Sequence, residues 1–221
     1  MTARAHVFTV DVEDWYQGLA LDPGEWPRFA PRLQTGLARL LGLLDEAGVR
    51  ATFFVVGWQA ERTPEVVRDM ARHGHEIACH GYSHHFVYRQ ARGAFREEVR
   101  RSRGVLEDIV GAPVVGFRAP FFSITADALW ALDVLVEEGF LYDSSIFPMR
   151  VRLYGVAGAP LGIYRPALAD LARHDPAGPV VEFPVAVRAL GPLRLPVAGG
   201  FYLRALPLGL LCAALEGIRR E

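Results

Sequence analysis

The sequence of 221 residues contains little cysteine, almost no net charge and no long apolar run. Its two cysteines, Cys79 and Cys212, are too few for a disulfide framework or a thiolate metal cluster. The formal net charge of −1 gives no basic field for binding nucleic acid or an anionic membrane surface. We therefore expect no nucleic-acid partner.

The longest charge-free apolar run near the C-terminus covers residues 205–215, shorter than the roughly 20 residues that a membrane helix needs. No secretory leader is visible, because the N-terminus reaches Asp11 after a single short apolar run. These features predict a cytoplasmic protein without a transmembrane segment. Because 51% of the residues are hydrophobic, the chain is expected to fold around a substantial core.

Short β-branched segments alternate with amphipathic ones along the chain. The apolar segments predict strands at 6–12, 51–56, 76–79, 113–117, 140–143 and 180–185. The segments between them predict helices, one opening with Thr63 as its cap and Pro64 in its first turn. This alternation is typical of parallel βαβ units, and no linker divides residues 1–221, so we expect a single domain. The Gly/Pro-rich segment 149–179 is expected to cross the mouth of a barrel.

Two groups of polar residues follow expected strands. His80 and His84 lie four residues apart after the third strand, and Asp11, Glu13 and Asp14 follow the first. Two imidazoles and a carboxylate are a common ligand set for a catalytic divalent metal ion, with one position left open. Barrel enzymes keep such groups at the C-terminal ends of their strands. The pattern therefore predicts a metal site at that end.

Four motifs, taken in order, resemble those of the polysaccharide deacetylases, also called NodB-like carbohydrate esterases. Residues 9–14 resemble the family's Thr-Phe-Asp-Asp-Gly motif, and residues 80–84 its His-(Ser/Thr)-x-x-His motif. Residues 117–120 resemble its Arg-x-Pro motif, and residues 142–145 stand where its fourth motif is expected. Further segments are similar to the branch found with exosortase-linked exopolysaccharide genes. The resemblance covers nearly the whole chain.

The resemblance implies a deformed (β/α)7 barrel that removes N-acetyl groups from an N-acetylated exopolysaccharide. It implies that His80, His84 and one acid hold a single divalent ion, Zn²⁺ or a similar metal. Asp11 stands at the family's catalytic-base position, and Arg118 would orient it by a charge-assisted pair. Pro120 and Tyr142 would contact the substrate, and Asp143 would either contact it or cap the rim of the barrel. A backbone N–H near Tyr142 would hold the oxyanion.

The first motif departs from the family pattern at the metal. The family usually has adjacent aspartates, whereas here two residues separate Asp11 from Asp14. Glu13 and Asp14 therefore compete for the ligand role, and the family's residue type favours Asp14. The departure also lends weight to an amide hydrolase of small cyclic imides or ureides on the same fold. A non-catalytic carbohydrate-binding or assembly protein is the third alternative.

The sequence also differs from the family's fifth motif, whose histidine protonates the leaving amine. No histidine follows His174, so we expect the chain to end before the last barrel strand, without this acid. His174 itself fits a loose Leu-x-x-His pattern but precedes the expected strand at 180–185. An unclosed barrel would expose a strand edge, which predicts a possible homodimer.

Overall fold

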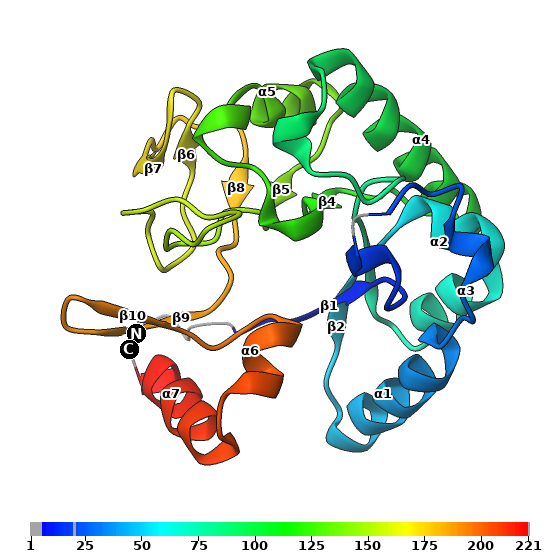
Figure 1. The fold of residues 1–221 in the computed structure, drawn as a ribbon, viewed down its shortest axis with the longest axis horizontal. Helices are drawn as coiled ribbons and strands as arrows, with labels where there is room; N and C mark the ends of the chain where they lie inside the picture. Colours follow the sequence, from blue (N-terminus) through cyan, green and yellow to red (C-terminus); the bar gives the residue numbers. More distant parts are fainter. Residues whose placement is uncertain (1–5, 20, 221) are drawn as a thin grey trace.

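The computed structural model describes residues 6–19 and 21–220. A sheet of six parallel strands forms its centre, in the order β1-β2-β3-β4-β5-β8. The strands are β1 (Phe8–Val12), β2 (Ala51–Val55), β3 (Glu76–Cys79), β4 (Gly116–Phe117), β5 (Tyr142–Asp143) and β8 (Val181–Glu182). The sheet curls into an incomplete barrel with helices along its outside (Figure 1). The predicted (β/α) barrel is confirmed, and its strands fall within the expected segments.

The helices of this half-barrel follow their strands on the outer side (Figure 1). They are α1 (Leu33–Ala47), α2 (Gly57–Arg62), α3 (Pro64–Arg72), α4 (Arg92–Val110) and α5 (Trp130–Glu137). α1 ends at Gly48, whose φ of 63° is the left-handed conformation that glycine adopts without strain. All five residues of β2 are buried, as expected for a parallel strand covered on both faces.

α2 was not foreseen, and it changes the role of Thr63. The hydroxyl of Thr63 donates to the Gln59 carbonyl, 3.0 Å away, and makes no capping bond to α3. The expected cap is therefore wrong, because Thr63 closes the preceding helix, where its hydroxyl reaches back to the carbonyl four residues earlier. Pro64 does occupy the first turn of α3.

The C-terminal half of the chain adds two hairpins and two helices. β6 (Pro166–Ala167) pairs with β7 (Asp170–His174), and β9 (Val187–Leu190) pairs with β10 (Leu193–Pro196). The Gly/Pro-rich segment therefore contains a hairpin that its composition did not reveal. α6 (Gly200–Ala205) and α7 (Leu208–Arg220) follow, and Figure 1 shows them beside the second hairpin. Among the described residues, none of the helices is long and apolar enough to cross a membrane.

Gly116 has no side chain, and the ring of Tyr142 from the neighbouring strand occupies the space that a side chain would fill. A Cβ at this position would overlap the tyrosine ring. Gly116→Ala is therefore expected to lower the free energy of unfolding by about 1–3 kcal/mol, measured by urea denaturation. Gly104→Ala is the matched control, since a Cβ at this position in α4 meets nothing within 4 Å. It should raise stability by about 0.5–1 kcal/mol. Equal effects of the two variants would contradict the packing argument.

Candidate metal and catalytic site

His80 and His84 are held by a fixed turn after β3. Gly81, between them, has a φ of 70°, and the backbone of His84 is itself left-handed, with a φ of 52°. The first N–H groups of α2 donate to the carbonyls of the turn, at 2.9 and 3.1 Å. Glu98 of α4 accepts hydrogen bonds from two backbone N–H groups and the Ser83 hydroxyl of the same turn. The turn is therefore anchored from two helices.

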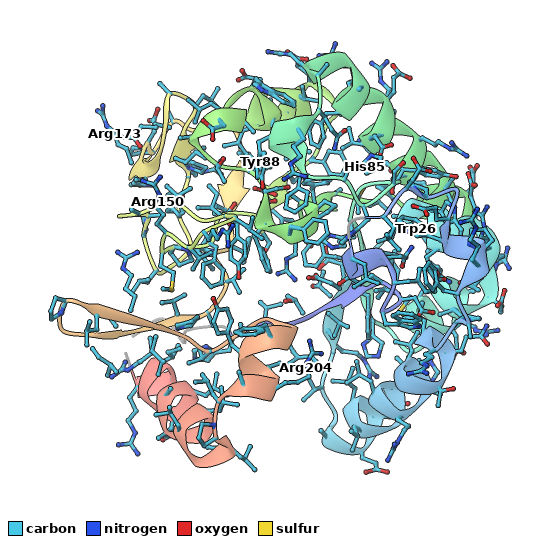
Figure 2. The ribbon with its side chains drawn as sticks, in the orientation of Figure 1. Trp26, His85, Tyr88, Arg150, Arg173 and Arg204 are labelled. Carbon is cyan, nitrogen blue, oxygen red and sulfur yellow. The ribbon has the colours of Figure 1, made fainter. Side chains whose placement is uncertain are left out.

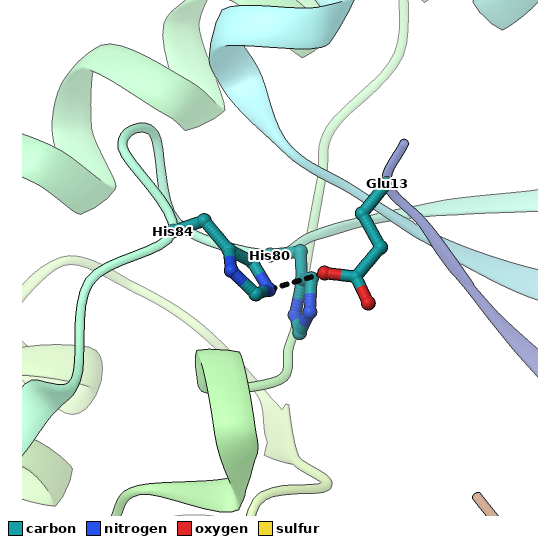
Figure 3. Close-up of side chains that lie close together, drawn as sticks. All are labelled: Glu13, His80 and His84. Carbon is teal, nitrogen blue, oxygen red and sulfur yellow. Dashed lines mark ion pairs between the residues drawn. The ribbon is translucent and has the colours of Figure 1, made fainter. Parts of the chain in front are cut away.

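The turn brings the two imidazoles to Glu13, which follows β1. One ligand atom from each of Glu13, His80 and His84 lies within 4.8 Å of the other two. Glu13 Oε2 is 2.5 Å from His84 Nε2 (Figure 3). Both histidines are buried, whereas Glu13 is half-buried. The cluster is thus enclosed on the histidine side and partly open at the carboxylate.

The ring orientations of both histidines suit a metal ligand. His80 Nδ1 is 2.8 Å from the Arg118 carbonyl, and His84 Nδ1 is 3.1 Å from the Gln17 carbonyl. A carbonyl only accepts hydrogen bonds, so each Nδ1 carries the proton and each Nε2 keeps its lone pair. Burial also lowers the pKa of His80, which favours its neutral form.

The cluster also leaves polar atoms that need a partner. Among the described residues, neither Glu13 Oε2 nor His84 Nε2 has a hydrogen-bond partner, although both atoms are buried. A carboxylate oxygen facing two imidazole lone pairs is the donor set of a divalent transition metal ion such as Zn²⁺. Glu13, His80 and His84 therefore fit a metal ion.

Asp14, the acid that we expected to bind the metal, has a different role. Its Oδ2 accepts the backbone N–H groups of Arg32 and Leu33 at the start of α1, and its Oδ1 accepts that of Trp15. The side chain is buried and its acceptors are committed to the backbone. The structure therefore corrects the choice of Asp14 as the acid beside the histidines. Glu13 reaches the histidines, and Asp14 caps the N-terminus of α1.

Asp11 and Arg118 form an ion pair beside the cluster. Arg118 Nη1 donates to Asp11 Oδ1 at 2.8 Å, which is the contact expected from the sequence. Burial by itself would raise the pKa of Asp11, but the charge and the hydrogen bond of Arg118 lower it, and the pKa falls below its usual value. Asp11 is therefore ionised at neutral pH. Arg118 also donates to Thr9 Oγ1 and to both oxygens of Ser144.

Of the three residues expected to contact the substrate, Pro120 and Asp143 are buried and Tyr142 is half-buried. Pro120 begins a short 3-10 turn. Tyr142 packs against the rings of Phe54 and Phe183, and burial and the nearby carboxylate of Glu76, at the far end of β3, raise its pKa. The side chain of Asp143 is fully enclosed. The enclosed side chain of Asp143 is not presented to a substrate, and the substrate roles of Pro120 and Tyr142 stay predictions. The backbone N–H of Tyr142 itself donates to the Val115 carbonyl, 3.4 Å away, and an oxyanion-binding N–H near this residue stays a prediction.

Residues that sequence reasoning did not assign surround the site. The ring of Phe121, in a left-handed backbone conformation (φ 56°), lies 4.6 Å from that of His84. Ser144 and Ser145 link Arg118 and Ala119 to β5. The signal for the serines was present, because they belong to the fourth motif, but nothing in that motif shows which residue they bind.

His174, the alternative general acid, lies in β7 and is exposed. Its Nδ1 accepts the backbone N–H of Arg165, the residue before β6, 3.2 Å away. Figure 2 shows its neighbour Arg173 at the outer edge of the molecule, and Figure 1 shows β7 on the far side of β5 and β8 from β1. The structure therefore does not bring His174 to the metal cluster.

Comparison with known proteins agrees with the geometry. The model of the family described as polysaccharide deacetylase matches residues 19–135. The chain belongs to the polysaccharide deacetylase family. A second family model, described as a domain of unknown function (DUF3473), matches residues 144–221. The family resemblance expected from the motifs is thereby confirmed. That residues 1–221 form a single domain stays a prediction.

This member of the polysaccharide deacetylase family is similar to several known proteins. It is 33% identical over 138 residues to the peptidoglycan deacetylase-like protein FGM2 of Gibberella zeae, covering 61% of this chain and 39% of that protein. It is 29% identical to a peptidoglycan-N-acetylglucosamine deacetylase of Bacillus cereus, covering 52% and 40% of the two chains. The chain thus spans less than half the length of these two relatives.

A solved structure extends the likeness to nearly the whole chain. The crystal structure from Mycobacterium smegmatis, described as a polysaccharide deacetylase, has a TM-score of 0.68 and 30% sequence identity. The match covers 97% of this chain and 72% of that one. The match therefore includes the half-barrel as well as the C-terminal hairpins and helices.

Proposed function

We propose that this polysaccharide deacetylase homologue is a metal-dependent hydrolase that removes N-acetyl groups from an N-acetylated exopolysaccharide. The observation that carries the proposal is the cluster of Glu13, His80 and His84 beside the ion pair of Asp11 and Arg118. Glu13, His80 and His84 would hold the ion, with Zn²⁺ as the first candidate. When bound, such an ion supplies Lewis acidity, which polarises an amide carbonyl.

The chain's own residues supply the base. Asp11 is ionised, so its carboxylate can accept a proton. It lies two residues before Glu13 along the chain, beside the cluster, and is therefore suited to take that proton from an attacking water molecule. Arg118 fixes the carboxylate of Asp11 in one orientation by a charge-assisted hydrogen bond. The half-exposed position of Glu13 leaves that side of the cluster open to a substrate. The products would be acetate and a free amine on the sugar.

The test measures acetate released by metal-loaded protein from a panel of N-acetylated glycans, with a cyclic ureide included. Acetate and free amine should appear in equal amounts, a chelator should lower the rate at least about 10²-fold, and Zn²⁺ should restore it. Turnover of the ureide without acetate release would instead favour the cyclic imide hydrolase, which the altered first motif also allows. Neither reaction would favour the non-catalytic alternative.

Three further points are part of the proposal and await tests of their own. The glycan is proposed to be an exopolysaccharide because of the branch that the sequence resembles. A cytoplasmic location and a homodimer stay predictions from the sequence. The expectation that the general acid is absent from this chain also stays a prediction, and no residue is assigned to that role.

A further inference from the structure

Asp143 and Glu182 bury two carboxyl groups side by side without access to solvent. They are register partners on the neighbouring parallel strands β5 and β8. Both residues have a relative exposure of 0%. Each of them keeps one buried carboxylate oxygen, Asp143 Oδ2 or Glu182 Oε2, that has no hydrogen-bond partner among the described residues. They take no part in the metal cluster, so their burial needs another explanation.

The hydrogen bonds around the pair leave a place for one proton between the two carboxyl groups. Ser145 Oγ donates to Asp143 Oδ1 at 2.5 Å, and the Ile146 N–H donates to Glu182 Oε1 at 3.0 Å. Among the described residues, the remaining oxygens, Asp143 Oδ2 and Glu182 Oε2, receive no N–H or O–H group. Two carboxylates enclosed on neighbouring strands repel each other, so a single proton shared between these two oxygens would relieve the repulsion and give both of them a partner.

The electrostatic surroundings agree with this arrangement. Burial raises the pKa of Asp143 to about 6, and burial together with Asp143 raises the pKa of Glu182 well above its usual value. Arg118 is the charged group that faces the pair, and its effect on the pKa of Glu182 is smaller. Tyr164, across from β8, is the other titratable neighbour; it is neutral because burial raises its pKa, and its hydroxyl donates to the Leu171 carbonyl.

The segment that follows Asp143 supplies hydrogen-bond acceptors for the guanidinium of Arg118. Ser144 Oγ accepts from Arg118 Nη2 at 2.7 Å, and the Ser144 carbonyl accepts from Arg118 Nε at 3.1 Å. Ser144 Oγ in turn donates to the carbonyl of Phe183, the residue after Glu182. Ser145 Oγ, which donates to Asp143, accepts the Ala119 N–H at 2.7 Å. The carboxyl pair therefore fixes both chain segments that hold the guanidinium.

We infer that Asp143 and Glu182, sharing one proton, are positioning residues that keep Arg118 aligned on Asp11. The inference rests on the proposed function, in which Asp11 is the base. Loss of the shared proton or of one carboxyl group would release the Ser144–Ser145 segment and shift Arg118. A misplacement of about 1 Å at a catalytic group is enough to cost about 10²-fold in rate.

The experiment compares Glu182→Ala, Glu182→Gln and the wild type, all loaded with Zn²⁺. Glu182→Ala removes the partner of Asp143 and of the Ile146 N–H, and should lower kcat about 10²-fold with little change in KM. Glu182→Gln keeps an N–H donor toward Asp143 at every pH, so it should recover most of kcat. It should also move any alkaline decline of kcat to higher pH. Leu106→Ala, a fully buried core residue of α4, controls for general destabilisation.

A second measurement is independent of activity. Because the folded state raises the pKa of Glu182 above 4.5, the stability that its proton contributes is present at low pH and is lost as pH rises through the folded pKa. The free energy of unfolding of the wild type should therefore fall with rising pH relative to that of Glu182→Gln. Crystal structures should show the Arg118–Asp11 contact kept in Glu182→Gln and lost or shifted in Glu182→Ala.

Several results would overturn the inference. They are full kcat in Glu182→Ala, equal losses of kcat in Glu182→Ala and Leu106→Ala, or an unchanged Arg118–Asp11 contact in the crystal structure of Glu182→Ala. If Glu182→Ala does not fold, a Glu182→Gln protein with the pH profile of the wild type overturns it instead. If the wild type releases no acetate from any glycan, the proposed function fails, while the stability and crystallographic measurements still decide whether the pair holds Arg118.

Discussion

Replacing Glu13 by alanine is expected to weaken Zn²⁺ binding by at least about 10²-fold, because it removes the carboxylate that faces His80 and His84. Even changes to residues behind a metal's ligands cost about 10–100-fold in affinity, and a direct ligand should cost more. Titration calorimetry with Zn²⁺, and metal analysis after dialysis, would measure the effect. Acetate release should fall in parallel, since the Lewis acid would be missing.

Asp14→Ala is the matched control for the Glu13 variant. It leaves the N–H groups of Trp15, Arg32 and Leu33 without their acceptor, and replacing a side chain that caps a helix by alanine costs about 0.5–2 kcal/mol. The folded variant should therefore bind Zn²⁺ with wild-type affinity but unfold at a lower urea concentration. Loss of metal in folded Asp14→Ala, together with full metal binding in Glu13→Ala, would return the ligand role to Asp14.

Asp11→Asn is expected to lower kcat by about 10²- to 10⁴-fold while Zn²⁺ affinity stays within a few-fold of the wild type. The asparagine keeps the shape of the side chain and loses the capacity to accept a proton from water at neutral pH. Steady-state acetate release and Zn²⁺ titration on the same preparation would separate the two effects.

Thr9→Val provides a comparison for the Asp11 variant. It removes a different acceptor of Arg118, the Thr9 hydroxyl at 3.0 Å, but leaves the carboxylate of Asp11 in place. It should therefore lower kcat far less than Asp11→Asn does. If Asp11→Asn instead loses its metal, Asp11 is a ligand and the base must be sought elsewhere.

The parts of the site that sequence could predict are those set by local pattern. The apolar run at 51–55 sufficed to place β2, and the short apolar run at 76–79 placed His80 at a strand end with His84 four residues later. The choice of Asp14 over Glu13 followed residue type, whereas the structure places Glu13 beside the two histidines. Along an extended chain, residues i and i+2 share a face, which groups Glu13 with Asp11 and separates Asp14.

The parts that sequence could not predict depend on partners distant in the chain. Asp143 lies within a motif, but its partner Glu182 is 39 residues away, and only the pairing of β5 with β8 brings them together. The assignment of Tyr142 to the substrate stays a prediction, because the motif does not show toward which end of the barrel its ring extends. Long-range register, and not local propensity, decides these positions.

The bond between Arg118 and Asp11 joins residues 107 positions apart in the sequence, and His84 contacts a carbonyl 67 positions away. Closing such loops carries an entropic cost before any contact forms, so parallel sheets of this kind assemble slowly. No single βαβ unit contains both the base and its guanidinium. If the proposed function holds, the capacity to bind Zn²⁺ during refolding would require β1 and β3, and catalytic competence would require β4 and β5 as well. The two gains would therefore report successive stages in the assembly of the barrel.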